Sequence, residues 1–196
     1  MLDFPTTDGT VLATLQVGDT LFVGGNFTQV FDDGNTYPRN YLFGIDLNTN
    51  NVLPWDPGLS AVVAPYPIAS LASAGDTLVV GGHIPTYQGA TTGHILGFNL
   101  TTGNAIETSP GVLWAPMAYP IVNNVAIWNN TLFASCRTNY VLGQGMPHDT
   151  LLVFNMPTAT PIPVDLVSSH NFIQRVYVHS NQLFLIGVIN PVFTSN

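Results

Sequence analysis

The stretch GDTLFVGGNF, from Gly18 to Phe27, returns almost unchanged as GDTLVVGGHI, from Gly75 to Ile84. Each copy begins with a turn dipeptide that tolerates positive φ and continues as an apolar run that ends in a glycine pair. An alternating apolar run precedes each turn, so each copy predicts a β-hairpin. The same pattern occurs four times, in VLATLQVGDTLFVGG from Val11, IASLASAGDTLVVGG from Ile68, VNNVAIWNNTLFASC from Val122 and FIQRVYVHSNQLFLIG from Phe172.

A second block follows the first three hairpins and contains an apolar strand, a turn rich in Thr, Asn, Gly or Pro, and a short further strand. Its copies are NYLFGIDLNTNNVLPW from Asn40, GHILGFNLTTGNAI from Gly93 and DTLLVFNMPTATPIPV from Asp149. Each repeat therefore predicts a four-stranded antiparallel unit, and a spacing of about 50 residues is typical of repeat architectures. No segment has a helical apolar period, and 15 Pro and 18 Gly interrupt the chain. We predict an all-β fold made of β-propeller blades, with an irregular β-solenoid or a sandwich as alternatives.

The repeats span residues 11–67, 68–121, 122–171 and 172–196, and the last one is incomplete. Residues 1–196 are thus predicted to form a single propeller fragment of about three and a half blades, whereas a closed propeller usually has at least about four. Open sheet edges invite pairing. We therefore expect either a piece of a longer polypeptide or edges that are covered by further β sequence or other subunits.

The run after each turn, such as TLFVGG, is predicted to be an inner strand with a neighbour on each side, because it is almost continuously apolar. The glycine pair at its end allows the backbone to lie close to an adjacent blade. Gly24 and Gly25 in the first repeat, and Gly81 and Gly82 in the second, are therefore expected to serve blade geometry.

The composition excludes several classes of partner. Only 7% of residues are charged, Lys is absent, and the formal net charge is -8, so the chain has no basic surface for nucleic acid. The most apolar window, Ala61 to Ala74, is too short and too rich in proline to span a bilayer. The N-terminal sequence MLDFPTTDG has no secretory signal, so either the protein stays inside the cell or an export signal lies outside this sequence.

The motif VGGNFTQV, from Val23 to Val30, and the segment PRNYLFGIDLNTNNVLPWDP, from Pro38 to Pro57, carry a family resemblance. They resemble the GG-x-F-T repeats of bacterial secreted and surface β-propellers, called delta-sixty repeats, and more loosely the extracellular propellers of fungal cortical polarity-marker proteins. The later repeats depart from the motif, since Ser135 and Cys136 replace the glycines of the third. The resemblance implies an extracellular or cell-surface scaffold or binding protein, with no catalytic residues to transfer.

The long connections, which would share one face of a propeller, are the expected place for a ligand. Aromatic side chains there could stack on a sugar or contact a protein partner, or they could pack the loops on themselves. The candidate ligand-binding residues are Tyr37, Arg39, Tyr66, Tyr87, Tyr119 and Tyr140.

Other candidate sites are weaker. Asp32, Asp33 and Asn35 offer oxygen ligands for calcium, but their spacing lacks the full pattern of a calcium loop, and a solvated turn explains them better. The five histidines show no metal-binding spacing, so no cofactor is expected apart from that calcium. Asn26, Asn99 and Asn129 begin N-x-Thr sequons, which would be glycosylated if a eukaryote secretes the chain.

Two functions remain open. The first is a non-enzymatic structural, adhesive or binding module that presents a loop-rich propeller face to a protein or glycan, within a larger polypeptide or assembly. The alternative is a propeller-type glycan hydrolase or lyase with carboxylates on the propeller axis. This sequence shows no nucleophile elbow or catalytic triad, and Glu107 is its single glutamate. The axial site of such an enzyme would therefore be completed by sequence not present here.

Overall fold

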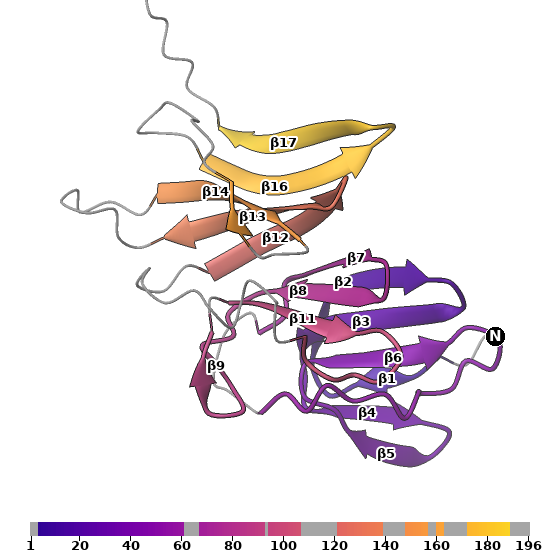
Figure 1. Cartoon of the computed structure of the whole chain (residues 1–196). Coiled ribbons are helices and arrows are strands. Elements are labelled where there is room, and N and C mark those ends of the chain that lie inside the picture. The colour runs from indigo at the N-terminus through magenta and orange to yellow at the C-terminus, as the bar shows by residue number, and fades with distance from the viewer. Residues whose placement is uncertain are drawn as a thin grey trace, which may run out of the picture.

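The computed structural model describes residues 4–60, 67–92, 94–106, 121–138, 148–156, 160–162 and 172–188. These residues form antiparallel strands, turns and connections, and no helix occurs among them. Four of the six sheets contain the predicted hairpins, follow one another in chain order and are here called the row. Figure 1 shows the third and fourth of them above the first two, which overlap in this view. The described chain also has no helix with the length and apolar character needed to cross a bilayer.

The first and second sheets have the same three-stranded order. The first sheet comprises β2 (Thr10–Val17), β3 (Thr20–Asn26) and β6 (Leu42–Asp46). The second sheet comprises β7 (Ser70–Ala74), β8 (Thr77–Gly81) and β11 (Ile95–Asn99). The predicted inner strands, β3 and β8, lie between two neighbours, as their continuous apolar character indicates.

The third and fourth sheets continue the series. The third comprises β12 (Ile121–Trp128), β13 (Thr131–Thr138), β14 (His148–Asn155) and β15 (Thr160–Pro161). The fourth comprises β16 (Phe172–His179) and β17 (Gln182–Val188). The predicted two-residue hairpins are confirmed, because the strand-end pairs are Val17 with Thr20, Ala74 with Thr77, Trp128 with Thr131 and His179 with Gln182.

The predicted fourth strand of each repeat is much reduced. In the first two sheets it is a single bridge, between Ile45 and Val52 and between Phe98 and Ala105. In the third sheet it is the two-residue strand β15, which pairs with β14.

Two predicted loops contain hairpins of their own, which corrects the expectation of irregular connections. Within residues 27–40, β4 (Gln29–Asp32) pairs with β5 (Asn35–Pro38), and β1 (Thr6–Thr7) pairs with the other edge of β4. In the second repeat β9 (Thr86–Tyr87) pairs with β10 (Ala90–Thr91). The turn residues Asp33 and Gly34 have φ of 49° and 78°, a pair of values that D-G hairpin turns favour.

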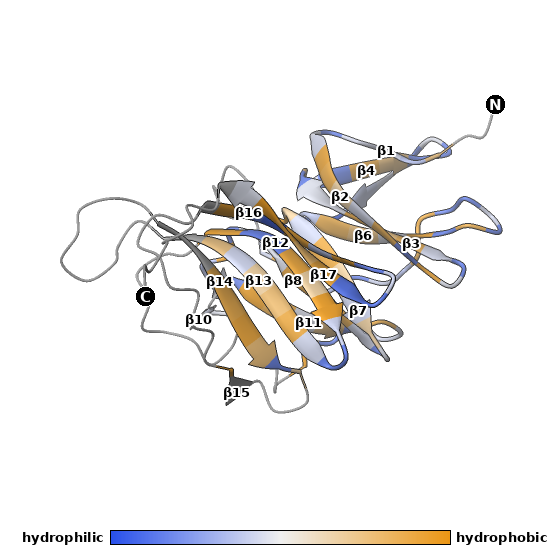
Figure 2. Cartoon of the chain, turned by 90° about the horizontal axis from the view of Figure 1, so that it is seen from above, coloured by the Kyte–Doolittle hydropathy of each residue, from blue (hydrophilic) through white to orange (hydrophobic). Residues whose placement is uncertain are grey.

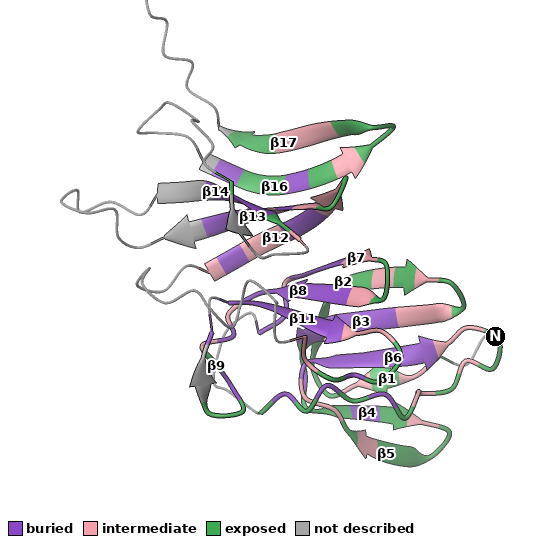
Figure 3. Ribbon diagram, viewed as in Figure 1, coloured by how far each residue is buried: buried purple, intermediate pink, exposed green. Residues whose placement is uncertain are grey.

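Apolar side chains fill the space between successive sheets. The first strands contact one another in series, β2 with β7, β7 with β12 and β12 with β16. One buried cluster, including Phe22, Leu42 and Leu78, lies between the first and second sheets, and another, including Val79 and Leu132, lies between the second and third. Figures 2 and 3 show that the strands within the row are apolar and buried, whereas the turns are polar and exposed.

The glycine pairs allow close packing, as predicted. A Cβ added to Gly24 would lie 2.5 Å from Cγ2 of Ile68, and one added to Gly81 would lie 2.6 Å from Cγ1 of Val122. In both cases the contacted residue belongs to the first strand, or to the residues just before it, of the next repeat. The glycine therefore sets how closely consecutive sheets approach.

A bulge recurs at one position of the repeat. Register shifts occur between Val11 and Ala13, between Val122 and Asn124, and between Ile173 and Arg175. Side chains five residues before the hairpin turn join neighbouring sheets, since Ser70 Oγ accepts from the Val125 N–H at 3.0 Å and Asn124 Oδ1 accepts from the Val176 N–H at 2.7 Å. The same repeat position thus provides a hydrogen bond to the following sheet in the second and third repeats.

Candidate functional site

The fourth sheet presents an uncovered surface, here called the end face, formed by Arg175, Tyr177, Phe184 and Ile186. Tyr177 and Ile186 are 47% and 48% exposed. Tyr177 lies opposite Phe184 in the β16–β17 ladder, and their rings stack with centroids 5.0 Å apart and planes at 16°. The opposite side of the sheet is different, because Ile173 and Val176 are buried against the third sheet. Figure 3 shows the exposed and half-buried residues of β17 at the end of the row.

The end face uses the positions that join sheets elsewhere in the chain. Counted from the hairpin turns, Tyr177, Phe184 and Ile186 correspond to Ala126, Phe133 and Ser135 of the third sheet. Ala126 and Phe133 pack against residues of the fourth sheet, and Ser135 Oγ donates to the Gln174 carbonyl at 3.1 Å. The end face is therefore an inter-sheet contact surface without a following sheet among the described residues.

The edge of β17 is a second feature of this site. In the other sheets the second strand pairs on one side with the first strand and on the other with β6, β11 or β14. Within the described residues, β17 pairs with β16 alone. A row of backbone donors and acceptors is thus available for another strand.

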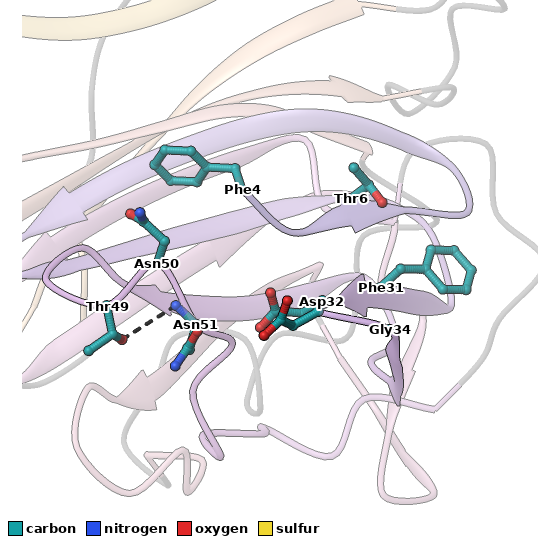
Figure 4. Close-up of a pocket in the computed structure, with 9 residues that line it drawn as sticks. Phe4, Thr6, Phe31, Asp32, Gly34, Thr49, Asn50 and Asn51 are labelled. Carbon is teal, nitrogen blue, oxygen red and sulfur yellow. Dashed lines mark hydrogen bonds between the residues drawn. The ribbon is translucent and has the colours of Figure 1, made fainter. Parts of the chain in front are cut away.

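An open cavity of about 510 Å³ lies at the other end of the molecule. Figure 4 shows Asp32 and Asn51 near its middle, with Phe4 and Asn50 toward one end and Phe31 toward the other. Its lining residues come from the N-terminal segment, the β4–β5 hairpin and the turn after β6: Phe4, Thr6, Phe31, Asp32, Asp33, Gly34, Thr49, Asn50 and Asn51.

The calcium candidates at this cavity already have structural contacts. Asp32 Oδ2 accepts a hydrogen bond from the Val52 N–H at 2.9 Å, which joins the β4–β5 hairpin to the segment that bridges to Ile45 of β6. Asn35 Nδ2 donates to the Asp33 carbonyl at 3.4 Å within the hairpin turn. In the described part of the chain no three His, Cys, Asp or Glu side chains gather as a metal site would require. The geometry is that of a hairpin turn.

Two of the predicted ligand-binding residues serve the interior instead. The Arg39 side chain is 11% exposed, forms an ion pair with Asp56 at 3.3 Å and donates to the Leu53 carbonyl at 3.2 Å. Tyr87 is 7% exposed, and its hydroxyl donates to the Pro57 carbonyl at 2.9 Å. Burial, and then the charge of Asp56, raises the pKa of Tyr87. Both residues make structural contacts with the connection between the first two sheets, and their role in ligand binding stays a prediction.

Of the remaining loop candidates, Tyr37 lies within the described residues. Tyr37 is half-buried in β5, with the Arg39 guanidinium carbon 5.9 Å from its ring centroid. Tyr66, Tyr119 and Tyr140 lie outside the described residues.

A stacked histidine pair lies beside the second sheet. The rings of His83 and His94 have centroids 5.3 Å apart. His94 Nδ1 accepts from the Ile84 N–H at 3.0 Å, and the residue is buried. Burial, and then the nearby His83, lowers the pKa of His94 to about 4. His94 is therefore neutral at ordinary pH and functions as a hydrogen-bond acceptor in the fold.

The three sequons differ in accessibility. Asn26 and Asn129 are exposed, at the end of β3 and in the β12–β13 turn. Asn99 is half-buried, and its Oδ1 accepts from the backbone N–H groups of Thr101 and Thr102. Their glycosylation stays a prediction.

Sequence reasoning did not single out the end face. A usable signal existed, because Tyr177 and Ile186 are much larger than their counterparts Ala126 and Ser135. Ile186 stands where the preceding repeats have Gly24, Gly81 and Ser135, so a large apolar residue there marks a different packing environment.

Comparison with known proteins defines the fold only. No protein-family model matches the chain, and no curated protein matches it. The crystal structure of the computationally designed Ika4 protein is similar, with a TM-score of 0.55 over 93% of this chain and 89% of that one, at 10% identity. At that identity the likeness supports an all-β repeat architecture and nothing about function.

Two further solved structures match with lower TM-scores. The WD40 domain of Pan2 from Neurospora crassa gives 0.36 at 13% identity, over 93% of this chain and 64% of that one. The extracellular domain of a one component system from B. thetaiotaomicron gives 0.41 at 13% identity, over 85% of this chain and 18% of that one. Such scores are too low to define a relationship. The fold of the described residues is all-β, with small antiparallel sheets.

Proposed function

We propose that the chain is a non-enzymatic structural and binding module, a partial β-propeller of delta-sixty type whose fourth sheet docks β-sheet structure from a protein partner. The observation that carries the proposal is the end face, because its residues occupy the positions that join consecutive sheets inside the chain. An extracellular or cell-surface location would suit such a module, as the repeat resemblance implies.

The chemistry of the end face favours a protein over a glycan. Tyr177, Phe184 and Ile186 form an apolar surface on the two-stranded fourth sheet, next to the edge of β17 that pairs with no other described strand. Backbone hydrogen bonds at such an edge provide affinity for an extended segment, and side chains on the adjoining face provide selectivity. No described observation favours the alternative of a glycan hydrolase or lyase with axial carboxylates.

A labelled peptide that copies residues 40–53 tests the proposal, because this segment supplies the third strand of the first sheet. Fluorescence anisotropy of the peptide with the full chain should show saturable binding, and Ile186→Asp should weaken it by more than about tenfold. The matched control is the same peptide with Phe43→Pro, which removes a backbone donor on the side of this strand that pairs with a second strand such as β3, and it should not bind. Equal binding of both peptides, or of neither, would contradict strand docking at the fourth sheet.

A further inference from the structure

The first sheet also exposes an inter-sheet contact surface, here called the first-sheet strip, formed by Val11, Leu12, Thr14 and Gln16 of β2. All four residues are exposed, and Val11 is 44% exposed although it is a large apolar residue. The strip belongs to the first strand in the series of contacts β2 with β7, β7 with β12 and β12 with β16, and the end face belongs to the last sheet of that series. The β1–β4–β5 sheet does not bury it, because that sheet packs on Val23, Phe43 and Ile45 of the first sheet.

The repeat positions show what the strip is suited to contact. Val11 corresponds to Ile68, Val122 and Ile173, which are 0%, 0% and 2% exposed. Ile68 packs on Gly24 and Val122 packs on Gly81 of the preceding sheet. Val11 thus occupies the position that contacts the preceding sheet, and the end face occupies the positions that contact the following sheet.

We infer that the partner of the end face is a second copy of this chain, which presents its first-sheet strip in a head-to-tail arrangement. The inference rests on the proposed docking role of the fourth sheet. It extends to another molecule an interface that already occurs between each pair of consecutive sheets in this one. A head-to-tail contact is heterologous, so it produces a ring if the rotation closes and a filament if it does not.

Polar groups at the two surfaces also match. Trp128 Nε1 donates to Asn181 Oδ1 at 2.9 Å across the contact between the third and fourth sheets. The corresponding residues at the two ends of the row are His179 and Asp19, because Trp128 aligns with His179 and Asn181 aligns with Asp19. Head-to-tail association therefore places an imidazole donor opposite an exposed carboxylate. In the same register Arg175 faces Thr14, whose hydroxyl can accept a hydrogen bond.

Ile186 makes the contact between copies wider than the contacts inside the chain. It occupies the position of Gly24, Gly81 and Ser135, where small residues let the innermost strands approach. Val11 has one methylene fewer than Ile68, which only partly offsets the added volume. The association is accordingly expected to be weaker than the packing of sheets within one chain, and reversible on dilution.

Complementary variants of the full chain test the arrangement by sedimentation velocity and light scattering over a range of concentrations. The wild-type chain should form assemblies larger than one copy that dissociate on dilution. Val11→Asp and Ile186→Asp should each lose these assemblies, because each variant keeps only one working surface. An equimolar mixture of the two variants should form a one-to-one dimer of twice the single-copy mass, since the intact end face of one meets the intact strip of the other.

The controls separate the possible outcomes. Ile162 is an apolar residue that is 40% exposed and belongs to neither surface, so the Ile162→Asp variant should assemble as the wild type does. Circular dichroism should show an unchanged fold for all three variants. Loss of assembly in Ile186→Asp but not in Val11→Asp would mean that end faces pair with each other, which overturns the head-to-tail contact. A wild-type chain that stays monomeric at every concentration also overturns the head-to-tail contact. If that monomeric chain still binds the 40–53 peptide, the proposed docking function is retained without the self-association.

Discussion

Single glycines control the spacing of the sheets. Gly24 has no unusual φ, so its requirement comes from the neighbouring Ile68 side chain and not from its own backbone. The same is true of Gly81 and Val122. The contact with the following repeat thus explains why the first two repeats both have glycine at this position.

Gly24→Ala should lower the free energy of unfolding by about 1–3 kcal/mol, because the added Cβ overpacks the contact with Ile68. Urea denaturation measures the effect. In a chain that already carries Ile68→Ala, Gly24→Ala should cause little further loss of unfolding free energy, as expected for residues in direct contact. Strictly additive effects of the two substitutions would show that the strain arises elsewhere.

His94 should make stability depend on pH. Its pKa of about 4 in the folded protein is below the ordinary value of 6.5, so the unfolded chain takes up a proton first as the pH falls. The stabilisation is fully present above pH 6.5 and is lost progressively as the pH falls toward 4. Thermal unfolding at a series of pH values should show this loss.

His94→Asn provides the control for that titration, because asparagine does not titrate and tolerates the φ of 65° at this position. The variant should lose the part of the pH dependence between 6.5 and 4. An unchanged profile would assign the dependence to other groups.

At the scale of elements, the hairpin turns show how the same strand pair is made with different residues. Asn129 and Asn130 have φ of 46° and 57°, and Ser180 and Asn181 have φ of 47° and 60°. In the first two repeats only the glycine of the turn has a positive φ. The turn dipeptide therefore changes while the two-residue length, which fixes the register, is kept.

Replacing Asn129 and Asn130 together by alanine should destabilise the fold by about 2–4 kcal/mol, because each alanine in the left-handed region costs about 1–2 kcal/mol. Chemical denaturation gives the difference from the wild-type chain. Asn26→Ala, an exposed substitution at a residue without positive φ, should change stability by less than about 0.5 kcal/mol. Similar losses for both variants would contradict a role for the turn conformation.

Local pattern predicted much of the fold and little of the site. The hairpins of the four repeats were predictable because alternation and turn dipeptides act within a few residues. The β4–β5 hairpin was missed although Asp33-Gly34 is a strong hairpin signal, because the surrounding segment was interpreted as a loop with a calcium candidate. The burial of Arg39 and Tyr87 could not be predicted, because it depends on contacts with the connection from Leu53 to Pro57, which is distant from Tyr87 in the sequence.

At the scale of the whole molecule, stability should decrease toward the fourth sheet. The second sheet is packed on both sides, whereas the fourth sheet is packed on one side by described residues. Amide hydrogen exchange in dilute solution should therefore be faster in β16 and β17 than in β7 and β8. Equal protection of the two hairpins in a dilute monomeric sample would show that the row unfolds as one unit.

The serial contacts between first strands also determine how the chain would respond to a pulling force. If opposite ends of the row are pulled apart, the load passes through one inter-sheet contact after another, including the Ser70 and Asn124 hydrogen bonds. The sheet held on one side should yield first, and each later rupture should release a repeat of about 50 residues, or roughly 170 Å of extended chain. Such stepwise lengthening would let the chain absorb a stretch without losing all of its structure at once.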